Sequence, residues 1–153
     1  MPVSKLKAFL DQQRIKYVRI IHSPAYTAQE TAESARIAGR ELAKTVMVKL
    51  DGRLAMAVLP ANRKVILDDL REATGATEAK FATENEFKDF FPGCETGAMP
   101  PFGNLFDMDV YVSPSLAEDS DIAFNAGTHA ELIKLAYKDF ERLVHPSLCR
   151  FST

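Results

Sequence analysis

The sequence predicts a mixed α+β domain in which a largely antiparallel sheet, or a partial barrel, is surrounded by helices. Segments with the alternation of strands and segments with helical spacing follow one another without a regular strand–helix–strand repeat. Asp51-Gly52 joins two apolar runs, which indicates a tight hairpin. The chain has 153 residues, of which 46% are apolar and 26% are charged, as in ordinary globular proteins. We therefore expect residues 1–153 to form one domain.

The hairpin is the clearest predicted element. Its first strand covers residues 44–50 and its second strand covers residues 53–59. The second run, from Leu54 to Leu59, is apolar on both of its faces. It is therefore expected to be a central strand that is covered on both sides.

The other predicted elements are shorter and flank this hairpin. Strands are expected over residues 17–21, 79–82, 109–112, 122–126 and 131–137. Helices are expected over residues 4–14, 27–39, 65–73, 83–91 and 137–144. Thr27 and Thr83 begin capping-box patterns, and Gly75 and Pro146 mark two helix ends. In the helix over 65–73, the side chains expected to face inward are those of Ile66, Leu67 and Leu70.

Charge and cysteine content argue against several classes of protein. The net charge is −2, so no overall basic field would attract the chain to DNA. No apolar run approaches the length of a membrane span. Cys94 and Cys149 lie far apart and form no metal-type pair, which favours a reduced, cytoplasmic protein, although one disulfide stays open. Nothing in the sequence requires more than a monomer.

Lys44 is the first residue that suggests chemistry. It opens the first hairpin strand and shares a face with Val46, Val48 and Leu50. Lysines are seldom buried without a partner, and a desolvated lysine can bind an anion or polarise a carbonyl group. The alternative is that Lys44 lies at the strand end and reaches solvent. The residues alone leave both interpretations open.

A second candidate is the loop Gly97-Ala98-Met99-Pro100-Pro101-Phe102-Gly103. Each proline fixes its φ angle and restricts the residue before it, while the glycines permit unusual angles. Such a loop is stiff and can form a wall beside a ligand, or it can simply turn a corner. Among the histidines, His129 is the most informative, because Gly127-Thr128-His129 follows a strand and could line a pocket. His22, His129 and His145 show no metal spacing, and no nucleophile motif or glycine-rich phosphate motif occurs.

Three motifs then occur in a fixed order along the chain. They are Ala43-Lys44-Thr45-Val46-Met47-Val48, the loop from Gly97 to Gly103, and Phe124-Asn125-Ala126-Gly127-Thr128-His129. In this order and at these separations they resemble the YbaK / prolyl-tRNA-synthetase-associated domain superfamily. The resemblance runs from the segment His22-Ser23-Pro24 to the last helix.

The resemblance implies a free-standing trans-editing domain, which hydrolyses the ester between a wrong amino acid and its tRNA without a cofactor or metal. It implies two partners, the acceptor end of a mischarged tRNA and an aminoacyl-tRNA synthetase. The family's essential lysine falls on Lys44. The substrate-binding residues that the resemblance implies are Tyr26, Gly97, Ala98, Met99, Pro100, Pro101, Gly103, Gly127, Thr128 and His129. Many relatives have serine or threonine where this chain has Pro100, so the amino acid removed stays unnamed.

The chemistry expected of such a site needs no protein nucleophile. An aminoacyl ester is already activated, and the neighbouring ribose hydroxyl can assist attack by water. Lys44 is expected to hold the terminal phosphate or ribose and to favour the developing oxyanion, while loop amides contact the carbonyl oxygen. Selection among small residues such as Ala, Ser and Cys is difficult, because one methylene contributes only about 1–3 kcal/mol.

Other functions stay open at this point. The same cleft would serve a non-catalytic module that holds an aminoacyl-tRNA end or a synthetase. A different small hydrolase, acting on Cys-tRNA or on a free ester, is a further alternative. A DNA-binding protein is the weakest candidate, because the chain is acidic overall and lacks a basic recognition helix.

Overall fold

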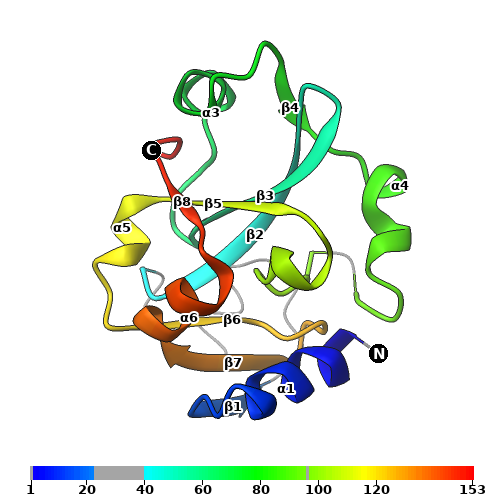
Figure 1. The fold of residues 1–153 in the computed structure, drawn as a ribbon, viewed down its shortest axis with the longest axis vertical. Helices are drawn as coiled ribbons and strands as arrows, with labels where there is room; N and C mark the ends of the chain where they lie inside the picture. Colours follow the sequence, from blue (N-terminus) through cyan, green and yellow to red (C-terminus); the bar gives the residue numbers. More distant parts are fainter. Residues whose placement is uncertain (1, 23–39, 96) are drawn as a thin grey trace.

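The computed structural model describes residues 2–22, 40–95 and 97–153 (Figure 1). The helix predicted over residues 27–39 and the candidate Tyr26 lie outside these residues. No helix in the described part of the chain is long and apolar enough to span a membrane.

The described residues contain one mixed sheet of eight strands. The strands are β1 (Tyr17–Ile21), β2 (Leu42–Leu50), β3 (Arg53–Pro60), β4 (Ala79–Phe81), β5 (Asp109–Val112), β6 (Asp121–Asn125), β7 (Glu131–Ala136) and β8 (Ser147–Leu148). Their order is β1-β7-β6-β2-β3-β5-β8, and β4 also pairs with β2. The pairs β2–β6, β3–β5 and β5–β8 are parallel and the others are antiparallel. The predicted mixed α+β class is confirmed, and the sheet is not closed into a barrel.

The predicted hairpin is formed by β2 and β3. Its register runs from Ala43 opposite Pro60 to Leu50 opposite Arg53. The turn residues Asp51 and Gly52 have φ angles of 51° and 84°, which fit the left-handed turn that Asp-Gly favours. The Asp51 carboxylate also accepts hydrogen bonds of 3.0 Å and 2.8 Å from the amides of Thr77 and Glu78, which ties the turn to the segment that leads into β4.

The helices pack around the sheet (Figure 1). They are α1 (Pro2–Gln12), α3 (Leu67–Thr74), α4 (Glu84–Phe87), α5 (Pro114–Ala117) and α6 (Tyr137–Val144), with 3-10 turns η1 (Lys88–Phe90) and η2 (Gly103–Leu105). The bounds predicted for α6 are confirmed exactly. The capping box at Thr83 and the left-handed Gly75 after α3 are also confirmed.

Three local expectations were wrong or incomplete. Ile66 does not face inward: it is 37% exposed and precedes α3, where its amide donates to the carbonyl oxygen of Phe151. Pro114 ends β5 as predicted but also opens α5, because proline suits the first turn of a helix. The turn η2 and the strand β8 have only three and two residues, too few for a periodic pattern.

Both faces of the central strands are covered. On one face, α1, α6 and the loop around Phe102 pack on the sheet; this main core includes Leu6, Leu10, Met56, Val58, Phe102, Phe124, Ile133 and Phe140. On the other face, α3 and the C-terminal segment cover β3; this cluster includes Val48, Ala55, Ala57, Leu59, Leu70 and Phe151. Every residue of β3 from Ala55 to Pro60 is buried, as predicted for a central strand.

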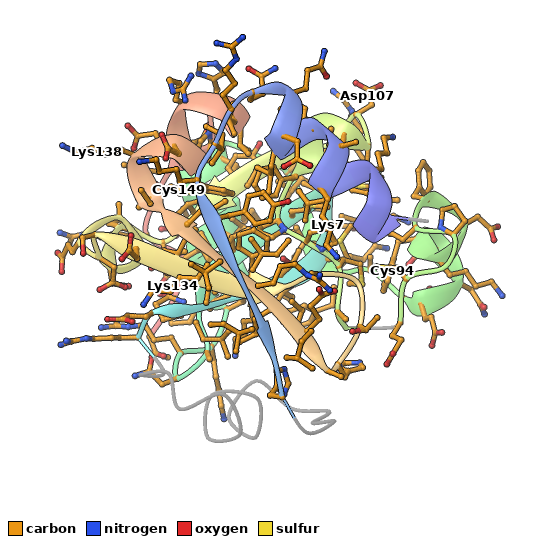
Figure 2. The ribbon with its side chains drawn as sticks, turned by 90° about the horizontal axis from the view of Figure 1, so that it is seen from below. Lys7, Cys94, Asp107, Lys134, Lys138 and Cys149 are labelled. Carbon is orange, nitrogen blue, oxygen red and sulfur yellow. The ribbon has the colours of Figure 1, made fainter. Side chains whose placement is uncertain are left out.

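Glu131 fixes the start of β7 to its neighbours. Its carboxylate accepts hydrogen bonds from Arg19 of β1 at 2.6 Å and from Lys7 of α1 at 3.2 Å. Figure 2 shows α1 beside β1 on this side of the molecule, with Lys7 labelled. Burial acts to raise the pKa of Glu131, but the two cationic donors outweigh it and lower the pKa. The turn that precedes Glu131, which carries His129, is therefore firmly held.

Gly103 is needed for close packing within the proline loop. A methyl group at this position would lie 2.4 Å from the main-chain oxygen of Met108 and 2.6 Å from Cγ2 of Val110. Because a main-chain atom cannot move aside cheaply, we expect Gly103→Ala to lower the free energy of unfolding by about 1–3 kcal/mol. Equilibrium unfolding in urea measures the change.

Gly75→Asn is the control, because Gly75 has open space around it and asparagine tolerates its φ angle of 75°. An equal loss of stability in both variants would contradict the packing explanation.

Candidate active site

Lys44 lies beside a gap along one edge of β2. On the other edge, β3 pairs with β2 over its whole length. On this edge, β6 pairs only at Leu42 and Ala43, and β4 pairs only from Val48 to Leu50. In the described part of the chain no strand pairs here with residues 44–46, whereas the Ala82 amide, just after β4, donates to the main-chain oxygen of Met47 at 3.0 Å. Lys44 is thus the first residue after β2 and β6 part.

On the edge of β6 that faces β2, the hydrogen-bond partner changes just after Phe124. The Ala123 amide of β6 donates to the Glu41 carbonyl oxygen at 3.0 Å, on the β2 side. The Ala126 amide points to β7, where it donates to the main-chain oxygen of Glu131. Main-chain groups alternate in direction along an extended chain, so the amide and carbonyl groups of the next residue, Gly127, point back toward the β2 side. There the Gly127 amide donates to the main-chain oxygen of Ala98 at 2.9 Å, and the Glu95 amide donates to the main-chain oxygen of Gly127 at 2.8 Å. The segment 95–98 thus replaces β2 along this edge.

This exchange brings together residues from all three motifs. Phe124 is paired with Ala43, so Asn125 and Lys44 each directly follow the last pair between the two strands, on the same face of the sheet. Two residues beyond the end of β6, Gly127 hydrogen-bonds Glu95 and Ala98, which flank Gly97 in the loop segment. The sequence motifs are far apart in the chain, but strand pairing joins the first motif to the third, and hydrogen bonds of Gly127 join the third motif to the loop.

Gly97 and His129 are in direct proximity. A Cβ atom built on Gly97 would lie 3.5 Å from Cε1 of His129. Gly97 is exposed and has a φ angle of 85°, and Gly127 has a φ angle of 98°. Both positions therefore favour glycine on backbone grounds. His129 is buried, with 8% of its surface exposed. The Thr128 hydroxyl accepts a hydrogen bond from the Ala130 amide at 3.3 Å.

The rest of the loop is buried beneath Gly97. The buried residues are Ala98, Met99, Pro100, Pro101, Phe102 and Gly103. The Phe102 ring packs against Phe124 and Phe140, with ring centroids 5.3 Å and 5.5 Å away. Among the candidate loop residues, Gly97 is thus the one exposed to solvent, while the others anchor it to the core.

Lys44 is partly buried on the face predicted for it. It shares that face with Val46 and Val48, whereas Ala43 and Met47 enter the main core on the opposite face. Burial lowers the pKa of Lys44, and the positive charge of Lys64 lowers it further. Lys64 was missed by the sequence analysis, since nothing in the sequence relates these two lysines across 20 residues.

The two cysteines are free thiols on well-separated parts of the molecule (Figure 2). Burial raises the pKa of the Cys94 thiol to about 11, and Glu95 adds to the effect. Cys94 is therefore a neutral thiol near neutral pH and a poor nucleophile. Within the described residues, no three His, Cys, Asp or Glu side chains form a group that could hold a metal ion.

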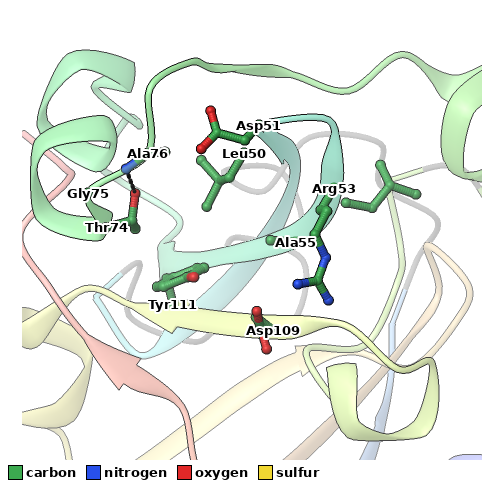
Figure 3. A pocket seen from close by; sticks show the side chains of 10 residues that line it. Leu50, Asp51, Arg53, Ala55, Thr74, Gly75, Ala76, Asp109 and Tyr111 are labelled. Atoms are coloured by element: carbon green, nitrogen blue, oxygen red, sulfur yellow. Dashed lines mark hydrogen bonds between the residues drawn. The ribbon is translucent and has the colours of Figure 1, made fainter.

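A separate hollow lies at the turn end of the hairpin (Figure 3). It encloses about 230 Å³ and is lined by side chains that include Arg53, Asp109 and Tyr111. Its β2 contributor, Leu50, is six residues from Lys44, or roughly 20 Å along an extended strand. This hollow therefore does not coincide with the candidate active site.

Comparisons with known proteins identify the family. The family model described as an aminoacyl-tRNA editing domain matches residues 22–143. The chain is 29% identical to the multifunctional Ser/Thr-tRNA deacylase ProXp-y of Escherichia coli K12 over 152 residues, covering 96% of this chain and 90% of that protein. It is 27% identical to the prolyl-tRNA editing protein ProX of Acetoanaerobium sticklandii, covering 90% of this chain and 87% of that protein.

A solved structure shares the fold. The crystal structure of a candidate trans-editing enzyme for prolyl-tRNA synthetase superposes with a TM-score of 0.82 at 17% identity, covering 99% of this chain and 97% of that one. The family predicted from the three motifs is thus confirmed by the family model over most of the chain. This protein belongs to the aminoacyl-tRNA editing domain family.

Proposed function

We propose that this protein is a trans-editing aminoacyl-tRNA deacylase that removes a small, wrongly attached amino acid from tRNA. Lys44 and the Gly97 loop position the ester for attack by water. The observation that supports the proposal is the exchange of partners at β6: the strand pairs with β2 up to Ala43, next to Lys44, and Gly127 then hydrogen-bonds Glu95 and Ala98 on the same side. Membership of the editing family and the names of the two curated relatives support the reaction.

Lys44 supplies positive charge where the reaction develops negative charge. A partly buried ammonium group has fewer competing water molecules, so it interacts more strongly with a phosphate or an oxyanion. Lys64 adds a second positive charge close enough to affect the pKa of Lys44. Both charges favour the anionic end of a tRNA over a neutral ester.

The Gly97 loop supplies rigidity rather than reactive side chains. Its exposed residue, Gly97, sits on a buried base that includes Pro100, Pro101 and Phe102. Water attack on an activated ester depends mainly on position, and a loop fixed in the core holds its main chain in place. Tyr26, Thr128 and His129 complete the proposed substrate-binding set, with His129 beside Gly97.

The amino acids proposed as substrates are small. Ala, Ser and Cys are the proposed amino acids, and Thr joins them because one relative is named a Ser/Thr-tRNA deacylase. We propose that the protein acts as a monomer in the cytoplasm, on tRNA and beside a synthetase. A non-catalytic module that binds the same tRNA end is the alternative, and it would show no turnover.

Lys44→Ala tests the catalytic role of this lysine. We expect deacylation of mischarged small aminoacyl-tRNAs to fall by at least about 100-fold, because the variant lacks the charge that stabilises the oxyanion. A panel of Ala-, Ser-, Cys- and Thr-tRNAs measures the rates, and circular dichroism checks the fold.

Lys49→Ala is the matched control, because Lys49 lies on the same strand but its side chain pairs with Glu86. Full activity in Lys44→Ala would remove this lysine from the mechanism. An inactive wild-type protein across the whole panel would favour the binding module.

Gly97→Val tests the loop. The side chain would both strain a φ angle of 85° and crowd the exposed point beside His129, so we expect deacylation to fall by about 10–100-fold. Gly75→Val is the control, since its φ angle of 75° carries similar strain in open space far from the loop in the sequence. Equal activity in the two variants would show that the loop is only a connection.

A further inference from the structure

Asn125 is a polar residue of the third motif that does not belong to the proposed substrate-binding set. Its side-chain oxygen Oδ1 is buried and has no hydrogen-bond partner among the described residues. A buried carbonyl oxygen without a partner is destabilising, and folded proteins usually satisfy such atoms. An unpaired acceptor at a functional site therefore suggests that a ligand supplies the missing donor.

The position of Asn125 in the sheet places this acceptor on the same face as Lys44, at the level where β2 and β6 separate. Ile20, Leu132 and Asn125 are in register across β1, β7 and β6, and Lys44 is opposite Leu59 across β2 and β3. Asn125 and Lys44 each follow the last β6–β2 pair, Phe124 with Ala43, so the five side chains form one row on one face, without strand pairing between Asn125 and Lys44. Asn125 and Lys44 are the two polar members of the row, and each comes directly after the last paired residues of β6 and β2. The row thus offers one cationic donor and one neutral acceptor in an apolar setting.

We propose that Oδ1 of Asn125 accepts a hydrogen bond from the α-ammonium group of the aminoacyl ester while Lys44 holds its oxygen-rich end. This inference rests on the proposed deacylase function and adds a substrate-binding residue to it. It makes Asn125 the residue that distinguishes an aminoacyl ester from a simple acyl ester.

The ammonium group is the donor that fits this acceptor. An aminoacyl ester carries a carbonyl oxygen and a positive amine on adjacent carbon atoms. Lys44 attracts the carbonyl oxygen but repels the amine, so the amine needs an acceptor of its own nearby. The buried carboxylate of Glu131 is on the opposite face, with Ile133, and is already bound by Lys7 and Arg19. In the row itself, Asn125 is the only side chain that can accept.

A substrate comparison tests the inference directly. Alanyl-tRNA and propionyl-tRNA differ only in the α-ammonium group, as do seryl-tRNA and 3-hydroxypropionyl-tRNA. We expect Asn125→Leu to lower kcat/KM by about 10–100-fold for the two aminoacyl esters, since a hydrogen bond to a charged group is lost. For the two deamino esters we expect a change below about threefold, because the lost interaction is absent there.

Asp121→Leu is the matched control, because Asp121 lies on the same face of the same strand, four residues before Asn125. It should leave the ratio between aminoacyl and deamino substrates unchanged. Where the deamino esters react too slowly, inhibition constants of amide-linked seryl and 3-hydroxypropionyl derivatives of 3′-amino-3′-deoxyadenosine give the same comparison.

An equal loss on both substrate types, or no loss on either, would overturn the role of Asn125 while leaving the deacylase function intact. A wild-type protein that hydrolyses no aminoacyl-tRNA would instead overturn the function itself.

Discussion

Two hydrogen bonds at Gly127 determine how the candidate site is assembled. They attach Glu95 and Ala98 to Gly127, three residues after Phe124, the last residue of β6 that pairs with β2. Together with the buried side chains of Met99 and Phe102, these hydrogen bonds fix the main chain of the loop relative to β6. They join the loop to the glycine turn just beyond the level where the two parallel strands separate, and Lys44 is the first residue of β2 that does not pair with β6 at that level.

The parallel pairing of β2 and β6 explains why the site is at this place. Parallel strands are joined by long connections, so residues remote in the sequence can end side by side. The third motif is more than 70 residues after β2 in the sequence, and the loop precedes β6 in the sequence. Main-chain hydrogen bonds set these positions, and the side chains of the main core hold them through Met99, Phe102 and Phe124.

Local chemistry made much of the fold predictable. Asp51-Gly52 specified the hairpin, Thr83 with Glu86 specified a helix start, and Gly75 a helix end, because each acts through neighbours in the chain. The face occupied by Lys44 was predictable from the two-residue period of a strand. Ile66 was predicted wrongly, because its exposure depends on a contact with the distant Phe151 segment.

The site was predictable as a set of motifs but not as a geometry. Gly97, Gly127 and His129 were named from the sequence, and the structure brings them together. The sequence did not indicate that Pro100 and Pro101 would be buried supports while Gly97 would be exposed. It also gave no sign of the charge of Lys64 near Lys44, nor of the unpaired oxygen of Asn125. These features depend on which strands are neighbours, and that information is non-local.

The central claim is that Lys44 and the Gly97 loop enclose the same reacting group. A crystal structure with an amide-linked aminoacyl derivative of 3′-amino-3′-deoxyadenosine tests it most directly, because this analogue cannot be hydrolysed. The account predicts that the acyl carbonyl group lies between the Lys44 ammonium and the main chain of Gly97. An analogue bound at the hollow beside Arg53 and Tyr111, with Lys44 and Gly97 both out of contact, would contradict it.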